Sequence, residues 1–147
     1  MKAQLAFLSL LCMPLSSCVL YRADKVKVDH PLTTLEDGVQ IREILQGRGP
    51  AAEDGDEVTI DYTGYLADGS MFDSSIKRGV PVQFMLGQAP LSGWNTGVLG
   101  MQAGGSRRVQ LPPELAYGEQ GVEGLIPPNE TLVFEIELLK IGSEPSE

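Results

Sequence analysis

The chain has 147 residues, of which 42% are hydrophobic, so it is long enough for one domain with a buried core and a tail. Its 11 basic and 20 acidic residues give a net charge of −9, which disfavours nucleic-acid binding because phosphate contacts need clustered Lys and Arg. With one histidine and two cysteines, it cannot build a four-ligand zinc site or an iron–sulfur site, and we expect no metal and no cofactor.

The first residues have the features of an export signal that ends in a lipidated cysteine. Lys2 precedes a nearly continuous apolar run, residues 3–15, which is too short to span a bilayer comfortably. Residues 15–18 then read Leu-Ser-Ser-Cys, which resembles the lipobox of bacterial lipoproteins. An ordinary signal peptide with a chance cysteine is the alternative. We expect residues 1–17 to be a lipoprotein signal peptide and Cys18 to be the lipidation site.

Residues 18–36 are interpreted as the lipidated cysteine and a flexible tether. They mix acidic and basic side chains without periodicity, and at ~3.5 Å per residue they could hold a domain up to roughly 60 Å from a membrane. His30 lies here and is expected to be a solvated linker residue. The implied location is a bacterial cell membrane or outer membrane, with the domain on the exported side. We expect the lipid to be the only membrane anchor, because residues 37–141 carry a net charge of −8.

Residues 37–141 are predicted to form one domain of mainly antiparallel β-structure. Val58, Ile60 and Tyr62 alternate with polar residues, which is typical of a half-buried strand. Asp68-Gly69 predicts a tight turn. Near the end of the chain, residues 132–138 alternate in the same way and predict a final strand, and residues 142–147 are expected to be a disordered tail.

One stretch between the strands has helical spacing instead. Leu91, Trp94, Val98 and Met101 recur at intervals of three and four residues, with Ser92 as a candidate N-cap. Several glycines weaken this helix, so it should be short and should need to pack against a sheet. Residues 118–130, which contain three glycines and two prolines, predict a long loop of the kind that often carries function.

The familiar hydrolytic motifs are missing, and the aromatic residues are the notable set. There is no Gly-x-Ser-x-Gly sequence, no histidine in the domain to act as a base, and no P-loop. Seven of the nine aromatic residues lie between Tyr62 and Phe134. They could simply form the core, or several of them could line a concave pocket; composition alone leaves both interpretations open.

A series of short motifs resembles the FKBP-type peptidyl-prolyl cis–trans isomerases. The matching segments, in chain order, are Val58-Thr-Ile-Asp-Tyr-Thr-Gly64, Leu66-Ala-Asp-Gly69, Phe72-Asp-Ser-Ser75, Phe84-Met-Leu-Gly87, Gly93-Trp94, Ala116-Tyr-Gly118, Ile126-Pro-Pro128, Thr131-Leu-Val-Phe134 and Glu137-Leu-Leu-Lys140. Each motif alone is weak, but they occur in order at compatible spacings, and the match runs over about residues 37–141. The resemblance implies an α+β fold, in which a twisted antiparallel sheet of about five strands wraps around one short α-helix.

The resemblance also implies an activity, the interconversion of cis and trans X-Pro bonds. Its barrier of ~18–20 kcal/mol comes from lost amide resonance, so a catalyst needs only to favour the twisted amide. The implied catalytic residues are Asp73, the Tyr117 hydroxyl and the backbone N–H of Ile126, with Arg78 helping to orient Asp73. The implied substrate-binding residues are Tyr62, Phe72, Val82, Phe84, Pro90, Leu91, Trp94, Leu125 and Phe134, with Trp94 as the pocket floor.

Other interpretations stay open at this level. Asp73 could instead cap a surface turn, and Trp94 could be a core residue of the helix. The segment before the helix is one residue shorter than in familiar members, and Val122 and Leu125 replace common loop residues. These changes could alter sequence preference and macrolide inhibitor binding. The expected partners are proline-containing polypeptides, bound by a monomer that assists the folding of exported proteins. A non-catalytic peptide-binding module is the alternative, and strong chaperone activity is not expected.

Overall fold

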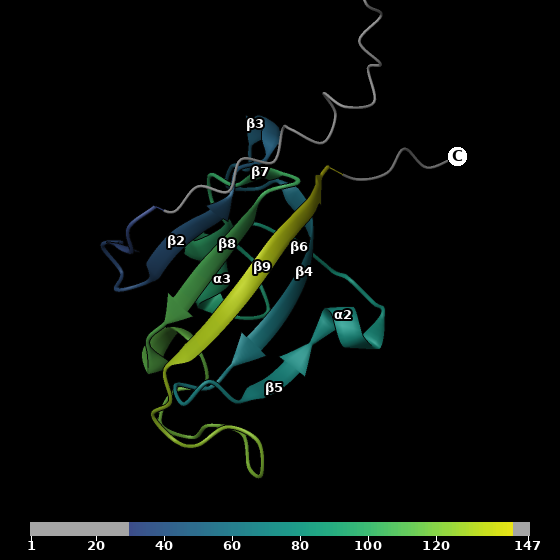
Figure 1. The fold of residues 1–147 in the computed structure, drawn as a ribbon. Helices are drawn as coiled ribbons and strands as arrows, with labels where there is room; N and C mark the ends of the chain where they lie inside the picture. Colours follow the sequence, from purple (N-terminus) through teal and green to yellow (C-terminus); the bar gives the residue numbers. More distant parts are fainter. Residues whose placement is uncertain (1–29, 143–147) are drawn as a thin grey trace, which may run out of the picture.

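The computed structural model describes residues 30–142 of the chain. The predicted signal peptide, Cys18, most of the tether and residues 143–147 therefore lie outside the described residues. Within them the chain forms strands and short helices in a single α+β unit (Figure 1). The strands are β1 (Thr33–Thr34), β2 (Gln40–Leu45), β3 (Arg48–Ala51), β4 (Glu57–Tyr65), β5 (Met71–Ser74), β6 (Val82–Met85), β7 (Gln102–Ala103), β8 (Ser106–Leu111) and β9 (Leu132–Ile141). The helices are α2 (Ser75–Arg78), α3 (Ser92–Val98) and a 3₁₀ turn, Pro113–Leu115.

The main sheet has seven strands in the order β1-β2-β8-β9-β4-β5, with β6 also paired to β4. All its pairings are antiparallel, and β3 and β7 form a separate two-stranded sheet. The predicted fold class is confirmed, although "about five strands" was too few. The three shortest strands of the main sheet, β1, β5 and β6, have two to four residues each. The sheet begins at Thr33, four residues before the predicted domain boundary at residue 37.

The two predicted long strands are confirmed by their burial. In β4, every second residue from Val58 to Gly64 is buried, and in β9 Leu132, Phe134, Ile136 and Leu138 are at most 1% exposed. Because side chains alternate between the two faces of a strand, this pattern gives the sheet one apolar face. The predicted turn at Asp68-Gly69 also forms, since the Gly69 N–H donates to the Leu66 carbonyl.

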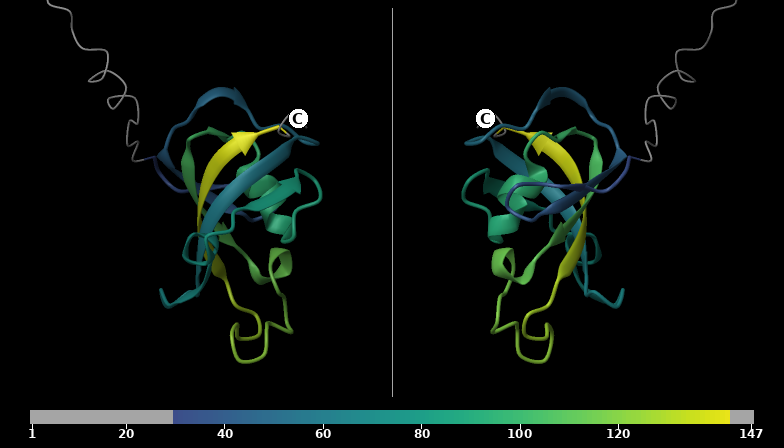
Figure 2. Two further views of the ribbon diagram at one scale, coloured as in Figure 1. Left: turned by 90° about the vertical axis from the view of Figure 1, so that its right-hand side faces the viewer. Right: turned by 90° about the vertical axis from the view of Figure 1, so that its left-hand side faces the viewer.

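Helix α3 covers that apolar face. The sheet curves around it when seen on edge (Figure 2). The helix lies close to β8 because two of its residues lack side chains: a Cβ at Gly93 would come within 2.4 Å of Leu111, and one at Gly97 within 2.6 Å of Val109. The glycines that weaken the isolated helix therefore allow its contact with the sheet.

The predicted start of this helix was wrong in one detail. Leu91, not Ser92, is the N-cap residue, and no side chain caps the first turn. Ser92 is the first helical residue, and its hydroxyl donates to the Leu115 carbonyl at 3.3 Å instead. No helix within residues 30–142 is long and apolar enough to cross a membrane.

Candidate active site

A cavity of about 130 Å³ opens between α3 with the loop before it, strands β4, β5 and β9, the start of β6, and the segment that follows β8. All the residues that line it belong to the set predicted from sequence. They are Tyr62, Phe72, Asp73, Val82, Pro90, Leu91, Trp94, Tyr117 and Phe134. The fold thus brings together side chains that lie up to 72 positions apart in the sequence.

Aromatic rings form the base of this cavity, and we call it the aromatic pocket. The Trp94 ring centroid lies 4.9 Å from that of Tyr62 and 5.2 Å from that of Phe134, with the second pair edge to face. Phe72 packs edge to face on Phe134 at 5.8 Å. The two interpretations of these aromatics are both correct, because Tyr62, Trp94 and Phe134 are buried in the core and also line the pocket.

Phe84 was predicted as a pocket wall, but it is not among the lining residues. It is 8% exposed and its ring packs against Trp94 with centroids 6.0 Å apart. Phe84 therefore supports the floor rather than facing the cavity. The indole N–H of Trp94 is buried and has no hydrogen-bond partner within residues 30–142, so packing rather than a hydrogen bond fixes its orientation.

One edge of the pocket is polar. The Tyr62 hydroxyl donates to Asp73 Oδ2 at 2.5 Å, and Arg78 Nη2 donates to the Tyr62 hydroxyl at 3.0 Å. Arg78 Nη1 also forms an ion pair with Asp73 Oδ1. Both carboxylate oxygens of Asp73 are thus occupied, and the predicted contact with Arg78 is present. The alternative for Asp73, a turn aspartate, also holds in part, since Oδ1 accepts the Ser74 N–H at 2.8 Å.

Helix α2 returns Arg78 to this edge. The Ser74 hydroxyl caps its start by accepting the Lys77 N–H, and Gly79 ends it with a positive φ of 70° that suits glycine. A single helical turn therefore separates Asp73 from Arg78. This local geometry places the guanidinium over the Tyr62 ring, with Cζ 5.7 Å from the ring centroid.

Two tyrosine hydroxyls at the pocket stay protonated at neutral pH. Burial raises the pKa of Tyr62 above its ordinary value, and its hydrogen bond to Asp73 raises it further. Burial and the negative charge of Asp73 also raise the pKa of Tyr117, whose residue is 40% exposed at the pocket rim. Each hydroxyl can therefore donate a hydrogen bond.

The predicted role of the Ile126 N–H was wrong. That N–H donates to the Val122 carbonyl at 2.8 Å, so it has no free hydrogen for a substrate. Leu91 offers the donor that the sequence reasoning missed. It lines the pocket just before the first turn of α3, and within the described residues its N–H makes no hydrogen bond. The sequence could have indicated this donor, because backbone N–H groups at the start of a helix lack intrahelical partners.

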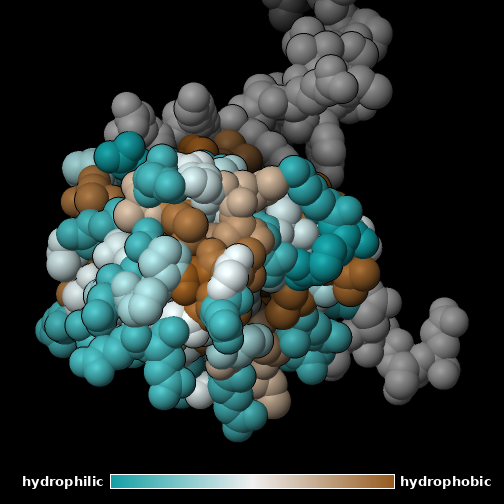
Figure 3. All heavy atoms as spheres, turned by 90° about the horizontal axis from the view of Figure 1, so that it is seen from below, coloured by the Kyte–Doolittle hydropathy of each residue, from teal (hydrophilic) through white to brown (hydrophobic). Residues whose placement is uncertain are grey.

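Leu125 and Ile126 lie apart from the aromatic pocket. They line a second, open hollow of about 520 Å³ within the loop at residues 118–130, together with Leu66 and the two prolines that follow Ile126. The structure thus separates these two residues from the other predicted ones. Figure 3 views the end of the molecule that carries this loop and shows hydrophobic residues gathered at the centre of the face, with hydrophilic residues around them.

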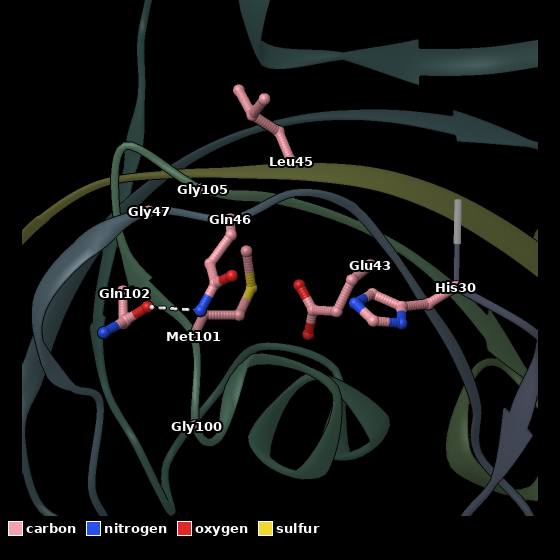
Figure 4. A pocket seen from close by; sticks show the side chains of 9 residues that line it. All are labelled: His30, Glu43, Leu45, Gln46, Gly47, Gly100, Met101, Gln102 and Gly105. Carbon is pink, nitrogen blue, oxygen red and sulfur yellow. Dashed lines mark hydrogen bonds between the residues drawn. The ribbon is translucent and has the colours of Figure 1, made fainter. Parts of the chain in front are cut away.

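A third cavity, of about 170 Å³, lies beyond the other end of α3 and shares no residue with the aromatic pocket. Figure 4 shows the side chain of Glu43 between His30 and Met101 in this cavity. His30, predicted to be a solvated linker residue, is exposed but lines this cavity. Among residues 30–142, no group of three His, Cys, Asp or Glu side chains could hold a metal ion.

The sheet around one helix and the aromatic pocket define a class of protein. Residues 49–139 match the family model for FKBP-type peptidyl-prolyl cis-trans isomerase, so the chain belongs to that family. Both the enzyme class and the fold implied by the sequence motifs are thereby confirmed.

Individual relatives agree with this assignment. The chain is 44% identical over 105 residues to the FK506-binding protein of Neisseria meningitidis serogroup B, covering 71% of this chain and 96% of the relative. It is 49% identical over 94 residues to FK506-binding protein 2 of Yarrowia lipolytica, covering 63% of this chain but only 65% of the relative. The crystal structure of FkpA from Escherichia coli is similar with a TM-score of 0.69 and 42% identity, over 78% of this chain and 53% of that one.

Proposed function

We propose that this protein catalyses the cis–trans isomerisation of X-Pro bonds in exported polypeptides while anchored to a membrane by lipid on Cys18. The observation that carries the catalytic part is the aromatic pocket, in which nine predicted residues meet, Trp94 among them. The lipid anchor rests on the sequence of residues 15–18.

In this proposal the proline ring of the substrate lies on Trp94, between Tyr62 and Phe134. The pocket excludes water from the amide. A planar amide is polar and well solvated by water, whereas a twisted amide has less charge separation. An apolar pocket therefore favours the twisted form relative to the planar one, and each ~1.4 kcal/mol of this difference gives a tenfold increase in rate.

Polar groups at the rim then hold the chain on either side of the proline. The Leu91 N–H and the Tyr117 hydroxyl are donors for two substrate carbonyls. Asp73 is held by Tyr62 and Arg78, so its carboxylate faces the amide in a fixed orientation. This arrangement requires no metal, nucleophile or general base.

The proposed ligands follow from the family. Two relatives are called FK506-binding proteins, which supports macrolide binding in the same pocket. Pro90 and Leu91 replace two aliphatic pocket residues of familiar family members. We therefore expect weaker macrolide binding, with proline binding retained. We expect the protein to act as a monomer.

The test of catalysis is isomerisation of a peptide series that varies the residue before proline, measured with the purified full-length chain. Trp94→Ala should lose most of the acceleration, and Glu53→Ala, an exposed substitution away from the pocket, should retain it. If a folded wild-type protein bound these peptides without accelerating isomerisation, the domain would be a non-catalytic peptide-binding module.

The test of anchoring is separate. Cys18→Ala should move the protein from the membrane to the soluble fraction, and it should abolish incorporation of labelled palmitate. The acidic domain gives no electrostatic attraction to anionic lipids, so no second anchor is expected. Retention of Cys18→Ala in the membrane fraction would contradict the proposal.

A further inference from the structure

A buried arginine lies at the end of α3 that is remote from the aromatic pocket. Arg107 is on β8, where Arg107, Val109 and Leu111 are the three inward-facing residues. Val109 and Leu111 pack under Gly97 and Gly93 of α3. Arg107 follows in the same row, beyond the last turn of the helix, and is only 5% exposed.

The guanidinium of Arg107 caps the C-terminus of α3. Its Nη1 donates to the Gly97 carbonyl and to the Leu99 carbonyl, each at 2.9 Å. The final carbonyls of a helix have no intrahelical donor and carry partial negative charge, so a cation there is favourable. No basic residue of the helix itself lies in its last turn.

A buried charge needs a partner, and Glu43 supplies it. Glu43 lies directly opposite Arg107 in the β2–β8 register, and its Oε1 accepts the Arg107 Nε–H at 2.5 Å. On its other side Glu43 lines the third cavity (Figure 4). The pair is therefore built into the sheet, and the guanidinium is fixed in front of the helix end.

Helix α3 makes few other hydrogen bonds with its surroundings. It has seven residues, two of them glycine, and no side chain caps its start. Asn95 accepts two N–H groups from the preceding loop, and Ser92 contacts the Leu115 carbonyl. Trp94 lies one turn before Gly97, and its indole has no hydrogen bond to any residue that the structure describes. A shift of the helix along β8 would therefore move the floor of the aromatic pocket.

We propose that Arg107 is a positioning residue for isomerisation: by capping the C-terminus of α3, it sets the place of Trp94 under the substrate proline. It acts through the helix and does not line the aromatic pocket. The inference rests on the proposed isomerase function, so its test needs a measurement besides activity. The chain supplies one, since Trp94 is the only tryptophan and reports its own surroundings by fluorescence.

The experiment compares four variants of the full-length chain with wild type. Arg107→Met removes both carbonyl contacts, and Arg107→Lys keeps the charge with a single donor group. The Glu43→Leu/Arg107→Met double variant removes the ion pair without leaving Glu43 unpaired, which protects the fold. Leu138→Ala is the control, because it truncates a fully buried side chain on β9 that does not line the aromatic pocket.

For the folded proteins we expect kcat/KM to fall about tenfold in Arg107→Met and in the double variant, with a smaller loss in Arg107→Lys. The Trp94 emission and its response to a proline peptide should shift in the same order. Leu138→Ala should be less stable but keep the wild-type kcat/KM and emission. Wild-type emission and kcat/KM in both methionine variants would overturn the inference. A wild-type protein without isomerase activity would instead refute the proposed function, while the fluorescence comparison would still report on Arg107.

Discussion

The Tyr62 hydroxyl and the Asp73 carboxylate meet at 2.5 Å, although the two residues lie on different strands of the sheet. Arg78 contacts both of them and completes a triangle of polar groups at the edge of an otherwise aromatic pocket. These contacts hold the Asp73 carboxylate in one orientation.

Removing the Asp73 side chain should lower kcat/KM for proline isomerisation by about tenfold, which corresponds to ~1.4 kcal/mol of transition-state stabilisation. Asp73→Asn should lose less than Asp73→Ala, because the amide oxygen can still accept the Tyr62 hydrogen bond. A protease-coupled or NMR exchange assay gives the rates, with Glu53→Ala as the surface control. Equal rates for Asp73→Ala and wild type would remove Asp73 from the mechanism.

The stability of the protein should decrease in alkaline solution partly through Tyr62. Its pKa is raised above 10.0 in the folded state, chiefly by burial and then by Asp73. The folded protein therefore holds this proton more tightly than the unfolded chain. That contribution to stability is complete below the unfolded value of 10.0 and is lost as the pH rises past it.

Urea unfolding of wild type and Tyr62→Phe between about pH 8 and pH 11 measures this contribution. The wild-type free energy of unfolding should fall more steeply than that of Tyr62→Phe at the alkaline end. Because the other tyrosines are common to both proteins, the difference reports Tyr62. Parallel curves would show that the Tyr62 environment does not distinguish the two protonation states.

Trp94→Phe should cost little stability. The substitution removes some packed ring area, but it also removes a buried N–H that has no partner among the described residues, and such groups cost ~1–3 kcal/mol. We expect a net loss below about 1.5 kcal/mol, against ~3–5 kcal/mol for Trp94→Ala. Chemical denaturation followed by circular dichroism measures both. If Phe proved as costly as Ala, the indole would have a stabilising contact that ring packing does not explain.

Gly97→Ala should destabilise the protein by ~1–3 kcal/mol, even though alanine is the better helix former. Its Cβ would come within 2.6 Å of the buried Val109 side chain and push α3 off the sheet. Thr96→Ala in the same turn is the matched control, and it should stay within about 0.5 kcal/mol of wild type. If Gly97→Ala had the wild-type free energy of unfolding, α3 could move away from the sheet without loss of stability.

Alternation and helical spacing were sufficient to predict the long elements. The β4 and β9 patterns identified their buried faces correctly, because side-chain alternation is a local property of a strand. The short strands β1 and β7 could not be predicted in this way. Each has two residues, which is too few to show a period, and each exists because a neighbouring strand offers hydrogen bonds.

The residues of the site were predicted less completely than the long strands. The family resemblance named every residue that lines the aromatic pocket, but it also placed Ile126 there as a donor. The local turn between Val122 and Ile126 uses that N–H, and only three-dimensional geometry shows this. Arg107 was missed for a similar reason. A basic residue in a strand normally suggests an exposed face, and its burial depends on Glu43, which is 64 residues away in the sequence.

The position of β9 in the sheet has a consequence for biosynthesis. This strand is made last among the described residues, yet it lies between β8 and β4 and pairs with both. A nascent chain that has not yet released residues 132–141 would have two separated halves of a sheet and no closed core. The domain therefore cannot complete its folding before synthesis of its final strand. The growing chain therefore stays incompletely folded until its synthesis is nearly finished.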